Sequence, residues 1–104
     1  MSDWTFLTNH AHVLLAIARD PGIRIEEIAT TVGFKPRAAH RVVTDLVEAG
    51  YLDREKVGRR NRYQIHAERP LRHDMERDHA IGELLGLLGP PPGALRPLPG
   101  LDGP

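Results

Sequence analysis

The chain has 104 residues, no cysteine, 27% charged residues and a formal net charge of zero. This length holds one domain, and the lack of thiols excludes a disulfide framework and a thiolate metal site. The amino-terminal residues lack the basic start and apolar core of a secretory signal, and no segment reaches the roughly 18–20 apolar residues of a membrane span. We therefore expect a soluble, cytoplasmic protein without a membrane partner.

The neutral total hides a basic segment in the middle of the chain. Residues 35–62 contain eight basic and four acidic residues, whereas residues 1–34 and 63–104 each carry a net charge of −2. A local excess of cations attracts nucleic-acid phosphates even when the whole chain is neutral. Because an ordinary arginine-rich surface has the same charge, the spacing of the residues must decide between the two.

A first helix is predicted from Thr8 to about Arg19. The Thr8 hydroxyl can cap its first turn, and Asp20-Pro21-Gly22 is strong turn chemistry at its end. Ile23-Arg24 is then expected to be a minimal strand that pairs with a later hairpin.

A second, short helix is predicted over residues 26–32. Glu26 and Glu27 in its first turn suit the helix dipole, and Gly33 suits its C-terminal end. The apolar residues share one face at spacings i, i+3, i+4 and i+7, namely Ile25, Ile28, Ala29 and Val32. Phe34 is expected to turn inward after this helix.

A third helix is predicted from Pro36, which is tolerated at a first helical position, to Ala49, with Gly50 just past its end. Its apolar face comprises Ala39, Val42, Val43 and Leu46. The opposite face comprises Arg37, His40, Arg41, Thr44 and Glu48. A helix that enters a DNA groove needs an apolar face to pack on its own domain and a cationic face to contact the DNA.

Two strands are predicted next, over residues 51–57 and 62–66. Gly58-Arg59-Arg60-Asn61 is expected to join them as a basic loop, with Asn61 serving the turn because it accepts positive φ.

A last helix is predicted from Pro70 to Leu88, with an apolar side formed by Leu71, Met75, Ile81, Leu84, Leu85 and Leu88. Gly82 and Gly86 either let another helix approach closely or leave the last turns frayed. Residues 89–104 contain six prolines and four glycines, a composition that predicts a disordered tail.

The cations of the third helix and the loop have the chemistry of DNA contacts. Arg37 and Arg41 can each donate to guanine O6 and N7, and His40 and Thr44 can bond base edges or phosphates. Arg59, Arg60 and Arg62 suit the phosphate backbone or a narrow minor groove.

Lys35 stands at the N-cap of the third helix, where Ser, Thr, Asp or Asn would stabilise it more. A cation there also opposes the helix dipole. Lys35 therefore lowers the stability of the helix at its N-terminus, and we interpret this cost as evidence for a contact between Lys35 and a DNA phosphate.

The stretch IEEIATTVGFKPRAAHRVVTDLVEAGYLDREKVGRRNRY, residues 25–63, resembles the winged helix-turn-helix domain of small bacterial transcriptional regulators of the MarR and ArsR families. The resemblance implies a mainly α fold with a small β-hairpin and additional N- and C-terminal helices. It implies double-stranded DNA as partner and a homodimer on a partly palindromic operator. The domains are then residues 1–66 for DNA binding, residues 67–88 as a C-terminal helix that dimerises, and the tail 89–104.

The sequence also bears on other classes of function. The sequence has no cysteine nucleophile, Gly-rich phosphate loop or G-x-S-x-G motif, so we expect no enzyme, and no cofactor is implied. A metal-responsive ArsR-type repressor remains an alternative because acidic residues and His73 and His79 crowd the predicted last helix, although these two histidines point to different faces and we assign no metal ligand. A winged-helix docking module is another alternative, and Trp4 and Phe6 are expected to pack either on a partner's last helix or within the same subunit.

Overall fold

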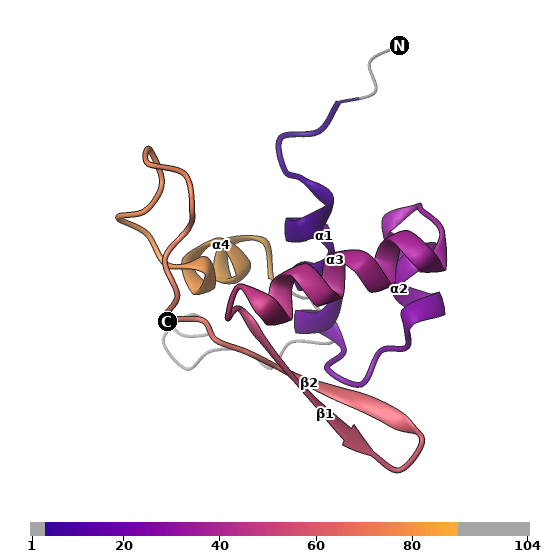
Figure 1. Ribbon diagram of the computed structural model, residues 1–104. Helices are drawn as coiled ribbons and strands as arrows, with labels where there is room; N and C mark the ends of the chain where they lie inside the picture. The colour runs from indigo at the N-terminus through magenta and orange to yellow at the C-terminus, as the bar shows by residue number, and fades with distance from the viewer. Residues whose placement is uncertain (1–3, 90–104) are drawn as a thin grey trace, which may run out of the picture.

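The computed structural model describes residues 4–89, which form a mainly helical domain with one antiparallel hairpin, the predicted fold class. In chain order its elements are α1 (Asn9–Arg19), α2 (Ile25–Val32), α3 (Pro36–Glu48), β1 (Leu52–Val57), β2 (Arg60–Ile65) and α4 (Ile81–Leu88) (Figure 1). Within the described residues, no helix is long and apolar enough to cross a membrane. The predicted disordered tail, apart from Gly89, lies outside the described residues.

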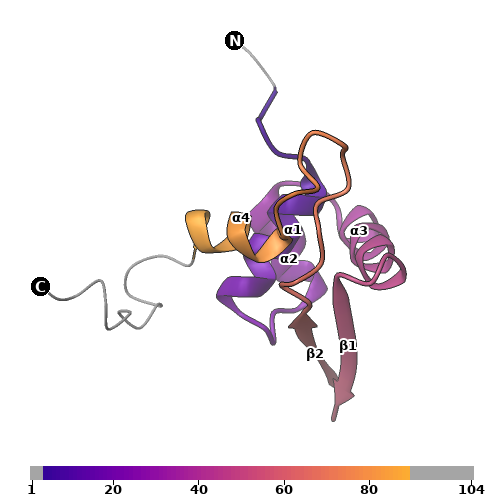
Figure 2. The ribbon, with the colours of Figure 1, turned by 90° about the vertical axis from the view of Figure 1, so that its left-hand side faces the viewer.

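Helix α1 is the centre of the domain. It contacts α2, α3, α4 and β2, and its side chains Val13, Leu14 and Ile17 are at most 2% exposed. Figure 2 shows α1 between α4 and α3. Thr8 occupies the N-cap position as predicted, but its hydroxyl makes no capping bond, so burial of the apolar face holds this helix.

The turn between α2 and α3 has three residues. Gly33 ends α2 with φ +99°, a conformation that suits glycine. Phe34 is half-buried and packs against the core, as predicted, and its N–H donates to the carbonyl of Ala29 at 3.0 Å. Lys35 then precedes α3 as its N-cap. This tight turn fixes how α3 leans on α2.

Gly50 follows the C-cap of α3, Ala49, and connects the helix to the hairpin. It has φ +88°, and the N–H groups of Gly50 and Tyr51 donate to the carbonyls of Val47 and Leu46 at 3.1 and 2.9 Å. These two bonds satisfy carbonyls at the helix end. They also direct Tyr51, 8% exposed, into the core, so β1 begins beside α3.

The turn of the hairpin is shorter than predicted. Val57 pairs with Arg60, so only Gly58 and Arg59 form the turn. Gly58 has φ +64°, and no non-glycine residue in the described chain has positive φ. A glycine at the first position of a two-residue turn matches the twist of paired strands. The expected role of Asn61 in the turn was therefore wrong, since Asn61 lies within β2 opposite Lys56.

The expected strand at Ile23-Arg24 does not form, because α2 begins at Ile25 and leaves too little extended chain. The same connection still holds the hairpin in place. The N–H of Tyr63 donates to the Pro21 carbonyl at 2.9 Å, and Arg60 Nη2 donates to the Gly22 carbonyl at 2.9 Å.

The last helix begins at Ile81, so the predicted start at Pro70 was wrong. Residues 70–80 form a loop closed at its neck by pairing of Pro70 with Ala80. The loop buries no apolar stripe, and Met75 is 88% exposed. The helix starts where Glu83 can cap it, with Glu83 Oε2 accepting from the N–H of Ala80 at 2.8 Å.

The two glycines of α4 have different surroundings. A Cβ on Gly82 would lie 2.7 Å from the Ala67 Cβ and 2.9 Å from the Ala67 carbonyl oxygen, whereas nothing lies within 4 Å of one on Gly86. The N–H of Gly82 donates to the Ala67 carbonyl at 2.9 Å. The close approach at Gly82 is therefore to the loop at Ala67 and not to another helix.

Candidate nucleic-acid interface

Helix α3 separates its residues into a buried and an exposed face, as its sequence predicts. Ala39, Val42, Val43 and Leu46 are 0–8% exposed and pack into the core. On the opposite face Arg37, His40 and Arg41 are exposed and Thr44 is half-buried. The structure therefore brings all four predicted reading residues onto one side of one rigid helix.

The cations of this face are available to a ligand. Within residues 4–89, no side chain forms a hydrogen bond or ion pair with Arg37, His40 or Arg41. Of the two acidic residues of α3, Asp45 pairs with His10 of α1 at 3.0 Å, and the exposed side chain of Glu48 forms no ion pair within residues 4–89. Because guanidinium groups without internal partners are satisfied by solvent or by a ligand, the α3 face has donors ready for phosphates and base edges.

Lys35 has the geometry expected of an unfavourable cap. Its backbone is extended (φ −81°, ψ 153°), Pro36 follows at the first helical position, and no side chain caps α3. The exposed ammonium group stands at the positive end of the helix, where a cation is destabilising.

Replacing Lys35 by Ser tests whether Lys35 lowers the stability of α3 while it contributes to DNA binding. Lys35→Ser gives α3 an N-cap hydroxyl, so we expect the free energy of unfolding to rise by about 0.5–2 kcal/mol. Loss of a phosphate contact should at the same time weaken DNA binding at every sequence. Denaturant unfolding and binding titrations measure the two effects. A variant that is both more stable and tighter on DNA contradicts a phosphate role for Lys35.

The three predicted wing arginines occupy different positions. Arg59 is at the turn and Arg62 on β2; both are exposed, and their side chains form no hydrogen bond or ion pair within residues 4–89. Arg60 uses one of its donors to hold the Gly22 carbonyl. A guanidinium has five N–H donors, so Arg60 can anchor the hairpin and still face a phosphate.

Two further cations belong to the hairpin and were not assigned to DNA from the sequence. Arg54 and Lys56 alternate along β1, opposite Tyr63 and Asn61, and both are exposed. Their spacing of two residues places them on one face of the strand. The alternation of these two cations is visible in the sequence, but only the strand register shows which residues of β2 lie on the same face of the hairpin.

Helix α3 and the hairpin form one continuous surface. The two elements are in contact; in Figure 2, α3 lies on the right-hand side of the domain, the hairpin extends below it, and α4 lies on the left. The segment 35–62 that they span has eight of the fourteen basic residues of the chain. The hairpin cations lie on both of its faces, because Arg54 and Lys56 are opposite Tyr63 and Asn61, whereas Arg60 and Arg62 are opposite Val57 and Glu55. Together with α3 they form a local excess of positive charge that the neutral total conceals.

The histidines and carboxylates of residues 73–79 do not assemble as a metal site. In the described part of the chain no group of three or more His, Asp or Glu side chains is placed to hold a metal ion. His79 Nδ1 instead lies 2.7 Å from Glu83 Oε1. This hydrogen bond raises the pKa of His79 and lowers the pKa of Glu83, so the two groups act as a pair at the start of α4.

A helix-turn-helix followed by a β-hairpin, with free cations on both, defines the winged helix-turn-helix class of DNA-binding domain. Residues 5–62, more than half of the chain, match the model of the MarR family. The chain belongs to the MarR family, whose members are DNA-binding transcriptional regulators. No curated protein gives a significant match.

Proposed function

We propose that this protein reads double-stranded DNA with α3 in the major groove and its hairpin wing on the backbone or in the minor groove. The observation that carries the proposal is the exposed face of α3, where Arg37 and Arg41 have no partner within residues 4–89. The remaining contacts in the proposal come from Lys35, His40, Thr44, Arg59, Arg60 and Arg62.

The spacing of the two arginines suits successive base pairs. Four residues of α-helix rise about 6 Å, while base pairs stack every 3.4 Å or so. Arg37 and Arg41 therefore reach edges about two base pairs apart when α3 lies along the groove. Each bidentate arginine contact with guanine discriminates by about 1–3 kcal/mol.

Pairing of two copies is part of the same proposal. Two symmetry-related α3 helices read two half-sites separated by about one turn of DNA, roughly 34–36 Å. Residues 1–66 form the reading unit and residues 67–88 contribute to pairing. As a chromosome-binding regulator rather than an enzyme, the protein then works in the bacterial cytoplasm.

Sequencing of genomic fragments retained by the protein tests the proposal. We expect enrichment of a partly palindromic sequence whose two halves lie about one helical turn apart. Retention of fragments in proportion to their abundance, without an enriched sequence, contradicts sequence-specific reading.

The wing has a separate signature in the salt dependence of binding. Each phosphate contact contributes about 0.9 to the slope of log K against log salt concentration. Arg59→Ala and Arg62→Ala should therefore each flatten the slope by roughly one unit, measured by fluorescence anisotropy on the enriched sequence. Arg77→Ala removes an equal charge from the 70–80 loop and should leave the slope unchanged. Equal slopes for all three variants contradict the wing contact.

A further inference from the structure

The chain entering α1 exposes two aromatic side chains. Trp4 is 68% and Phe6 is 92% exposed, and their rings meet edge to face with centroids 5.0 Å apart. We call residues 4–7 the aromatic arm. In Figure 1 the arm leaves the domain at the top, on the side opposite the hairpin. Exposed aromatic groups that touch mainly each other mark a surface made for a partner.

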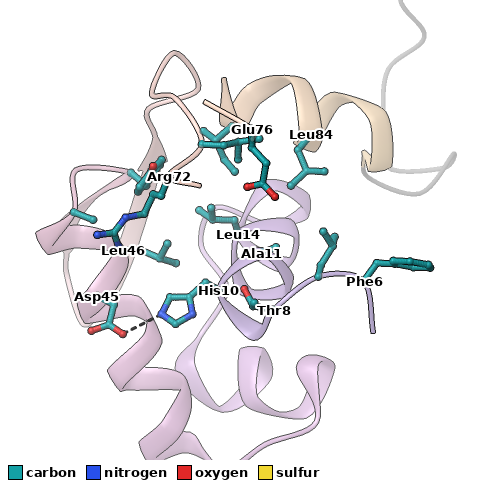
Figure 3. A pocket seen from close by; sticks show the side chains of 15 residues that line it. Phe6, Thr8, His10, Ala11, Leu14, Asp45, Leu46, Arg72, Glu76 and Leu84 are labelled. Atoms are coloured by element: carbon teal, nitrogen blue, oxygen red, sulfur yellow. Dashed lines mark hydrogen bonds and ion pairs between the residues drawn. The ribbon is translucent and has the colours of Figure 1, made fainter. Parts of the chain in front are cut away.

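An apolar groove of about 460 Å³ opens at the foot of this arm. Its floor includes Leu14, Leu46 and Ile81, all at most 5% exposed. Leu84 of α4 points into it from one side (Figure 3). Its polar rim includes the His10–Asp45 pair and Glu76 of the 70–80 loop. A volume of this size, with an apolar floor and a rim that also includes the polar Thr8 and Arg72, is typical of a preformed binding site.

The surroundings of the groove are unusually apolar for a protein surface. Six large hydrophobic residues are exposed in the described chain, and five of them lie on the arm, in the 70–80 loop or at the end of α4. The arm and the 70–80 loop border the groove, and α4 borders it through Ile81 and Leu84, which precede the exposed Leu87 and Leu88. The exception is Val57 near the tip of the hairpin. The groove includes Asp45 and Leu46 of α3, but neither Arg37 nor Arg41 nor any residue of the hairpin lines it.

The arm does not fill the groove beside it. Phe6 and Leu7 reach the rim, and Leu7 alone separates Phe6 from Thr8, the N-cap of α1. In Figure 3 the ring of Phe6 points away from the groove. We propose that the groove accepts the aromatic arm of a second copy of this chain, so that two copies exchange arms.

The area of such an exchange is that of a stable dimer. Two aromatic side chains bury about 150–250 Å² each. If each groove loses a similar area, two reciprocal arms remove about 1,200–2,000 Å², which is the standard size of a specific protein interface. Each chain has one arm and one groove. Two copies related by a two-fold axis therefore fill both grooves and leave neither arm unbound. The inference deepens the pairing of copies in the proposed function and leaves α3 and the wing free.

Trp4 is the single tryptophan of the chain, so its fluorescence reports where the arm lies. We expect dilution to shift Trp4 emission to longer wavelength in step with dissociation of the dimer, followed by sedimentation. Trp4→Ala with Phe6→Ala should raise the dimer dissociation constant about tenfold or more, since central aromatic residues dominate such interfaces. Circular dichroism should be unchanged, because both side chains are exposed.

A mixing experiment distinguishes exchange from all other occupants. Ala11→Arg blocks the groove with a long side chain but keeps Trp4 and the rest of the arm. If this variant unfolds, Leu84→Lys blocks the groove from the opposite wall. Either variant alone should be monomeric with solvent-exposed Trp4. Adding the arm-deficient variant, which lacks tryptophan and has an open groove, should restore a dimer with one docked arm and shift the emission to shorter wavelength.

Four results would overturn the exchange of arms: a wild-type monomer with exposed Trp4, a wild-type monomer with shielded Trp4, a dimer that persists without the arm, or no rescue on mixing. A small molecule bound to the purified monomer, seen as added mass in native mass spectrometry, would also overturn it. None of these measurements uses DNA, so their failure is distinguishable from failure of the α3 interface.

Discussion

Removal of Arg37 and Arg41 together is expected to reduce DNA affinity by about thirty-fold or more. The two guanidinium groups lie on the exposed face of α3 and have no internal partner in residues 4–89. Two bidentate base contacts are worth about 2–6 kcal/mol in total, and each 1.4 kcal/mol or so is tenfold in affinity. The free energy of unfolding of Arg37→Ala/Arg41→Ala should stay within about 0.5 kcal/mol of wild type, as for other exposed substitutions.

The matched control removes the same charge elsewhere. Arg19 ends α1 and Arg77 lies in the 70–80 loop, where its pair with Asp74 at 3.4 Å is exposed and therefore weak. Arg19→Ala/Arg77→Ala should lower affinity only slightly, and equally for all DNA sequences. Equal losses for the two double variants would mean that only net charge matters. Unchanged DNA behaviour for both would favour the docking-module alternative.

The two glycines of α4 should respond in opposite directions to the same substitution. Gly86→Ala meets open space and gains helix propensity, so we expect it to stabilise the protein by up to about 1 kcal/mol. Gly82→Ala gains the same propensity but places a methyl group 2.7 Å from the Ala67 Cβ and 2.9 Å from its carbonyl oxygen. Overpacking of this kind costs about 1–3 kcal/mol and strains the bond from the Gly82 N–H.

Denaturant unfolding of the two variants measures the contrast. The free energies of unfolding should differ by about 1–3 kcal/mol, with Gly82→Ala the less stable. Because both variants change one residue of the same helix, differences in helix propensity cancel. Equal stabilisation by both substitutions would show that α4 can move away from Ala67 without loss.

The DNA-reading part of the fold was readable from local pattern. In α3, apolar residues recur with the helical period and the cations fall on the opposite side, so one short segment specifies both packing and exposure. Gly33 and Gly50 mark helix ends by a requirement for positive φ that other residues meet only with strain. These signals act within a few residues of one another, and the structure follows them closely.

The carboxyl-terminal part was less predictable for a physical reason. Leu71, Met75 and Ile81 suggested one long apolar side beginning at Pro70, but a helix forms only where its face finds a surface to bury. Leu71 packs against the core, yet Met75 has no such surface. The cap by Glu83 then starts α4 at Ile81, with Gly82 fitted closely against Ala67.

By itself, the sequence determined the helix-turn-helix, the position of the hairpin and the cations that a MarR-family reading surface needs. Only the tertiary structure decided that Arg60 fastens the wing to Gly22 and that the aromatic arm stands beside an open groove. Periodicity and turn chemistry are local properties, whereas a hydrogen bond across 38 residues or a groove shared by α1, α3 and α4 depends on how distant segments meet. The contacts that set the wing and leave the groove open therefore arise only when the chain is folded.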